Sequence, residues 1–65
     1  MSQGRAQFHE QHLLDAQARA AHMFARKSEL QGAWLNWVAG QLYELKPAEF
    51  ASMVRRELQR LNNPP

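Results

Sequence analysis

Two histidines and an aspartate near the start of the chain come closest to the spacing of a chemical site. His9 and His12 are three residues apart, and Asp15 follows three residues later. On a helix these side chains fall on neighbouring turns, so the two imidazoles are close enough to share a metal ion. The pattern differs from the His-Glu-x-x-His motif of zinc proteases, which needs histidines four residues apart and a third ligand. We therefore expect a solvated polar face here, with no metal and no cofactor.

The serines and glycines do not form a catalytic pattern. Ser2, Ser28 and Ser52 lie in unrelated contexts, and the glycines are too widely separated to make a phosphate-binding loop. A chain of 65 residues also has little material with which to enclose a ligand pocket of ~300 Å³. We expect no catalytic residues and no enzymatic activity.

Arginines are the candidate contacts for nucleic acid. The residues in question are Arg19, Arg26, Arg55, Arg56 and Arg60. A net charge of +2 permits such binding, and two helices joined at Lys46-Pro47 could resemble a helix-turn-helix. On a helical wheel, however, Arg55 and Arg56 fall on opposite flanks of an apolar stripe, and two glutamates of the same segment would repel phosphates. Nucleic-acid binding is therefore the alternative hypothesis.

Aromatic and small residues indicate how the chain could bind another protein. Trp34 lies inside an apolar helical stripe and is predicted to be core, whereas Trp37 lies at its margin, where an indole can be a half-exposed anchor. Tyr43 is a further candidate on the same segment. Ala16 and Ala20, one turn apart, would let a second helix backbone approach closely. The candidate partner-binding residues are therefore Trp37, Tyr43, Ala16 and Ala20.

Helices alone are expected to position these side chains. β-branched residues are limited to two valines, no stretch alternates apolar with polar residues, and helix-forming residues dominate. Apolar residues at helical spacing predict helices over about 5–27, 28–45 and 47–61, with Pro47 suited to a first helical position. The fold class is all-α.

The expected architecture is a single small domain of three helices. The second and third helices form a hairpin at Lys46-Pro47, and the first covers this hairpin or joins another chain. Residues 1–4 and 62–65 are expected to be disordered tails. One alternative stays open: no residue between the first two segments must break a helix, so they could form one continuous rod.

Composition indicates the cellular compartment and the kind of genome from which the chain comes. There is no cysteine, so neither a disulfide nor a thiolate metal site can add stability. No signal peptide and no run of ~20 apolar residues is visible, which predicts a cytoplasmic protein with no membrane partner. Six arginines against two lysines, ten alanines and no isoleucine are typical of a GC-rich bacterial genome.

The predicted function follows from size and composition together. A domain this short buries only about 60% of its unfolded surface and has a limited core. We therefore predict a small bacterial interaction or regulatory module that binds another protein and associates with a second copy of itself through apolar helix faces. The alternative is a small nucleic-acid-binding regulator.

Overall fold

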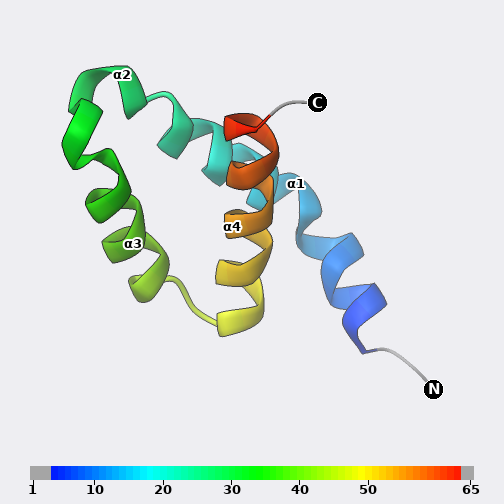
Figure 1. The fold of residues 1–65 in the computed structure, drawn as a ribbon. Helices are drawn as coiled ribbons and strands as arrows, with labels where there is room; N and C mark the ends of the chain where they lie inside the picture. The colour runs from blue at the N-terminus through cyan, green and yellow to red at the C-terminus, as the bar shows by residue number, and fades with distance from the viewer. Residues whose placement is uncertain (1–3, 64–65) are drawn as a thin grey trace.

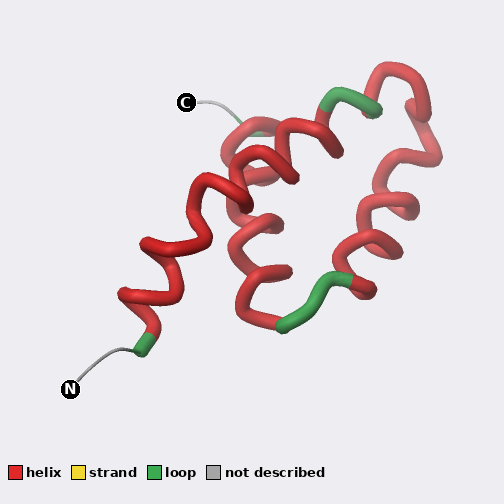
Figure 2. The backbone as a smooth tube through the Cα atoms, turned by 180° about the vertical axis from the view of Figure 1, so that it is seen from behind, coloured by secondary structure: helices red, strands yellow, loops and turns green. Residues whose placement is uncertain are grey.

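The protein is entirely helical in the part of the chain that the structure describes, which confirms the predicted fold class (Figure 1). A computed structural model describes residues 4–63. The elements are α1 (Arg5–Phe24), the short α2 (Lys27–Leu30), a 3₁₀ turn over Gln31–Ala33, α3 (Trp34–Glu44) and α4 (Ala48–Asn62). The loops between them are short, as the tube in Figure 2 shows.

The predicted three-helix arrangement is not confirmed, because the segment expected as one helix over 28–45 is divided. The chain turns at Ala25 and Arg26, so α1 ends three residues earlier than predicted and no continuous rod forms. A second interruption follows at Gln31, whose φ of 49° is a backbone conformation that residues with a side chain rarely adopt. This residue ends α2 and separates it from α3.

α1 and α4 form the main packing pair of the fold. In Figure 1, α1 crosses behind α4, while α3 descends to the connection at Leu45–Pro47 and α4 returns in roughly the opposite direction. The contact between α1 and α4 is more extensive than the contact between α3 and α4. α3 is therefore the least covered of the three longer helices.

The core is small and draws on all three longer helices. Its buried residues are Ala16, Ala20 and Met23 of α1, Trp34 and Val38 of α3, and Met53, Val54 and Leu58 of α4. α1 contributes two alanines, Ala16 and Ala20, to this cluster, and their small side chains let the α1 and α4 backbones approach closely. Larger apolar residues such as Phe8, Phe24 and Phe50 are only partly buried around it.

The predicted disordered tail at the carboxyl end is wrong for Asn62. Of the tails predicted to be disordered, residues 1–3 and 64–65 lie outside the described residues. Asn62, by contrast, is the last residue of α4 and is half-buried. Its side-chain oxygen accepts a hydrogen bond from the ammonium group of Lys27, which ties the end of α4 to the start of α2.

Candidate interaction surface

The two histidines considered as metal ligands are held in different surroundings. His12 is half-buried with its ring 4.3 Å from that of Phe8 and 6.1 Å from that of Phe50, so it packs between two aromatic rings. His9 is exposed. Among residues 4–63 there is no group of three or more histidine, aspartate or glutamate side chains that could hold a metal ion.

An open depression of about 630 Å³ lies where α1 passes the start of α4. Its lining includes His12, Asp15, Arg19 and His22 from one side of α1, Lys46 and Pro47 from the loop before α4, and Phe50 from the first turn of α4. The charged side chains around it are exposed and of both signs. The depression therefore offers a mixed, solvated surface, and no buried polar side chain of the described residues lines it.

The five arginines do not gather in one patch. Arg19 lines the depression just described, whereas Arg56 lines a separate depression beside His9. Arg26 and Arg60 are engaged by acids of this chain, with Glu29 at 2.7 Å and Glu57 at 3.6 Å. Arg55 is exposed. We find these cations spread over α1, the turn after it and α4 rather than along one face.

Glu57 shows how a carboxylate is accommodated within an apolar stripe. The sequence places it between the apolar positions Met53 and Leu61, where an unpaired buried charge would be costly. Its side chain is only 15% exposed and lies 3.6 Å from the guanidinium group of Arg60, which is one turn along and 74% exposed. The mostly buried carboxylate therefore has a cation of the same helix beside it.

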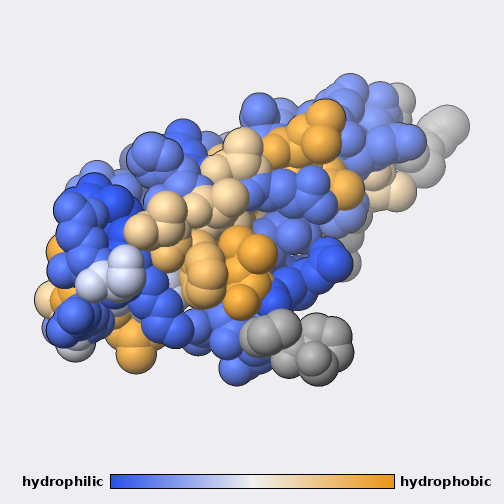
Figure 3. All heavy atoms as spheres, turned by 90° about the horizontal axis from the view of Figure 1, so that it is seen from above, coloured by the Kyte–Doolittle hydropathy of each residue, from blue (hydrophilic) through white to orange (hydrophobic). Residues whose placement is uncertain are grey.

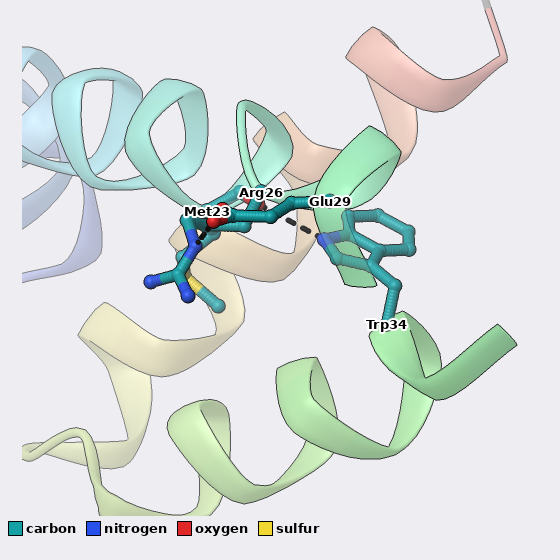
Figure 4. Close-up of polar contacts among 4 residues, drawn as sticks. All are labelled: Met23, Arg26, Glu29 and Trp34. Carbon is teal, nitrogen blue, oxygen red and sulfur yellow. Dashed lines mark hydrogen bonds and ion pairs between the residues drawn. The ribbon is translucent and has the colours of Figure 1, made fainter. Parts of the chain in front are cut away.

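Trp34 is interior, as predicted, and joins α3 to the end of α1. Its side chain is only 3% exposed, and the indole Nε1–H donates a hydrogen bond of 2.9 Å to the carbonyl oxygen of Met23 (Figure 4). The ring of Phe24 meets the indole edge-to-face at 6.1 Å, and the Lys27 ammonium lies 5.3 Å from the indole centre. Trp34 therefore fixes where α3 begins relative to α1.

Trp37 is half-buried, in agreement with its predicted position at the margin of the stripe. It packs against the core, and the guanidinium group of Arg26 lies 5.3 Å from its ring. The same guanidinium is held by Glu29, as Figure 4 shows. The exposed part of this indole is thus partly covered by an ion pair of its own chain.

The four candidate partner-binding residues do not share a surface. Ala16 and Ala20 are fully buried in the cluster that includes Val54, so the close approach they allow is taken up by α4 of the same chain. They are therefore not available to a partner. Trp37 and Tyr43 lie about 120° apart around α3 at 100° per residue. Of the four, Tyr43 is the most open, at 88% exposed.

One further apolar surface was not singled out from the sequence. Leu35 lies about 60° around α3 from the buried Val38, yet it is 70% exposed, because α3 buries only Trp34 and Val38. Leu35, Ala39 and Tyr43 follow one another at intervals of four residues, and all three are exposed. We call these three residues the α3 outer face.

The signal for this face was present in the sequence as an absence of charge. Every charged residue lies outside the stretch 30–43, which runs from Leu30 to Tyr43. A solvent-facing helix normally carries charges on its outer side, whereas the centres of protein interfaces are depleted of charge and enriched in aromatic residues. On the face of the molecule in Figure 3, apolar residues reach the surface in separate patches between polar ones.

Comparison with known proteins adds no assignment to this geometry: no protein-family model, curated protein or solved structure matches the chain. Within residues 4–63, none of the helices combines the length and the apolar character needed to cross a membrane.

Proposed function

We propose that this protein is a non-enzymatic interaction module of the bacterial cytoplasm that binds another protein chain through the α3 outer face. The observation that carries the proposal is the exposure of Leu35 and Tyr43 on a helix whose first charged residue is its last, Glu44. Large apolar side chains exposed singly are ordinary on protein surfaces. Here two stand on one side of a helix with no charged residue between them.

The packing of α3 supports the same conclusion. Only Trp34 and Val38 of this helix are buried, and its contact with α4 is limited. A helix that is apolar on more than one side is stable in water when a second surface covers it. A partner on the α3 outer face would supply that cover without disturbing the residues that hold α3 to the core.

Site-specific photo-crosslinking in cells tests the proposal. A photoreactive residue replacing Tyr43 is expected to form a covalent adduct with a protein, because that position is 88% exposed on the proposed surface. The matched control replaces Leu14, an apolar residue that is 79% exposed on a different helix, α1. Adducts at neither position, or equally at both, would contradict the proposal.

A further inference from the structure

We propose that residues 27–44 form a two-state switch, in which α2 and α3 interconvert between the bent arrangement of the structure and one continuous, straight helix. The ammonium group of Lys27 holds the bent state. The inference is independent of the proposed function. It follows from the backbone at Gln31, from the apolar row that crosses the bend and from the contacts that hold α2 in place.

The backbone at the bend is strained. Gln31 has φ 49° and ψ −117°, a combination that is open to glycine but crowded for a residue with a Cβ. The N–H of Trp34 donates to the carbonyl oxygen of Gln31, three residues back, instead of closing an α-helical turn on Leu30. Strain of this kind disfavours a state by roughly 5- to 150-fold relative to an unstrained one. The bent state therefore needs other contacts to maintain it.

The residues on both sides of the bend have the pattern of one helix. Glutamine is a good helix former, and of the residues at the bend Gly32 alone is a poor one. A Cβ added at Gly32 would meet nothing within 4 Å. Four apolar residues spaced four apart run across the bend, and all of them pack in or against the core: Leu30, Trp34, Val38 and Leu42. A straight helix would keep this row on one side and remove the strain.

The connection to α1 is long enough for the straight helix. In Figure 1, α2 lies at an angle to α3, between the end of α1 and the start of α3. The seven residues from Lys27 to Trp34 rise about 10.5 Å in a helix, and the three residues from Phe24 to Lys27 reach about 10–11 Å when extended. Phe24 can therefore keep its edge-to-face contact with Trp34 while α2 moves into line with α3.

The Lys27 side chain is the latch of the bent state. α2 buries none of its residues. The Lys27 ammonium donates a hydrogen bond to Asn62 at the end of α4 and lies 5.3 Å from the Trp34 ring centre and 5.6 Å from that of Phe24. In the straight helix Lys27 lies two turns from Trp34 and loses these contacts.

The latch and the strain are of similar size. One hydrogen bond and two cation–π contacts together favour the bent state by roughly 10- to 100-fold. This range overlaps the factor by which the strain at Gln31 opposes it, so the loss of either one shifts the populations. Lys27 is exposed, and the latch can therefore open while the core stays folded.

Nuclear magnetic resonance of single and double variants tests the switch. Nuclear Overhauser effects from the Hα of Glu29 to the amide of Ala33, and from Leu30 to Trp34, arise only when the helix runs through the bend. We expect both to be absent in wild type and present in Lys27→Met, which keeps the length of the side chain but not its charge. Adding Gln31→Gly should abolish them again, because glycine adopts the bent backbone freely and shifts the balance back by the same roughly 5- to 150-fold.

The double variant separates a switch from a simple loss of contact. If Lys27 only tethers α2, its removal leaves α2 unfixed and neither effect appears. The matched control is Lys46→Met, which neutralises the other lysine of the chain and should give the wild-type pattern. A folded Lys27→Met without the two effects, or a double variant that retains them, overturns the inference.

A second measurement covers the case in which Lys27→Met unfolds. Relaxation dispersion detects minor states that exchange on the microsecond-to-millisecond timescale. Wild type should show such exchange at the amides of residues 27–33, and Gln31→Gly alone should suppress it while keeping the latch. Absence of exchange in wild type, or equal exchange in Gln31→Gly, then overturns the inference.

Discussion

Replacing Trp34 by phenylalanine tests whether one indole holds α3 on the rest of the fold. The substitution keeps an aromatic ring in the core but removes the Nε1–H that donates to the Met23 carbonyl oxygen at 2.9 Å. That oxygen does not become orphaned, because it also accepts the backbone N–H of Arg26 at 3.1 Å. The hydrogen-bond loss should therefore be the net value of about 1 kcal/mol rather than the larger cost of an unsatisfied buried group.

The smaller ring also leaves a void where the indole was packed. Trp34 is 3% exposed, so the three non-hydrogen atoms that the substitution removes, two carbons and the nitrogen, are almost wholly buried, and their loss adds about 1–2 kcal/mol. The total is roughly 2–3 kcal/mol, against roughly 3–10 kcal/mol for the whole stability of a 65-residue chain. At about 7 °C per kcal/mol for this length, Tm should fall by about 15–20 °C. Trp34→Ala, at ~3–5 kcal/mol, should leave little folded protein.

Thermal melting followed by circular dichroism at a fixed protein concentration measures this difference. Trp37→Phe is the matched control, because its indole is half-buried and makes no hydrogen bond in the described structure. Its expected cost is below about 1 kcal/mol. The assigned role of Trp34 is refuted if Trp34→Phe melts within about 5 °C of wild type, or if the control is destabilised as much.

Three further changes probe the rest of the molecule. Trp37→Ala removes a half-buried indole with Arg26 over its ring. Circular dichroism should show retained helix content, and the photo-crosslink at position 43 should persist, because Trp37 lies about 160° from Leu35 around the helix. Gly40→Ala should raise Tm by about 4–7 °C in the same melting assay, since a Cβ there meets nothing within 4 Å and alanine is favoured in a helix interior by about 0.5–1 kcal/mol. If the chain is instead a nucleic-acid binder, its affinity for mixed-sequence DNA should fall steeply as the salt concentration rises. Arg55→Ala and Arg56→Ala should each reduce the slope of this salt dependence by about one unit. Absence of DNA binding at ~50 mM salt would refute this alternative.

Periodicity predicted the helical fold well because the apolar positions that repeat at helical spacing became the core. Met53, Val54 and Leu58 are buried in α4, and Trp34 and Val38 in α3, as their spacing indicates. The interruption at Gln31 was not predicted, because the residue that adopts positive φ is a glutamine and the neighbouring glycine, the natural candidate, does not. Local propensity would have placed a positive φ at Gly32 rather than at Gln31.

The candidate surface was predicted less well, because a helical wheel shows which residues share a side but not which side is covered. Ala16 and Ala20 have the spacing of a helix-packing seam, and only the structure shows that α4 of the same chain occupies it. Leu35 lies only about 60° from Val38 on the wheel, so the wheel alone does not indicate that one is exposed and the other buried. The short contact between α3 and α4 leaves it in solvent. A helical wheel does not show how many other helices pack against α3, and that number decides which of its residues are buried.

The small core has a consequence for how the sequence can change over evolutionary time. Only eight of the described residues are buried, so packing restricts few positions and most surface substitutions should cost little. The two alanines are the least tolerant of them, since any larger side chain would separate α1 from α4. Divergent relatives should therefore retain a sparse spacing pattern, two small residues four apart, a methionine three further on and a tryptophan eleven after that, long after their overall identity has been lost.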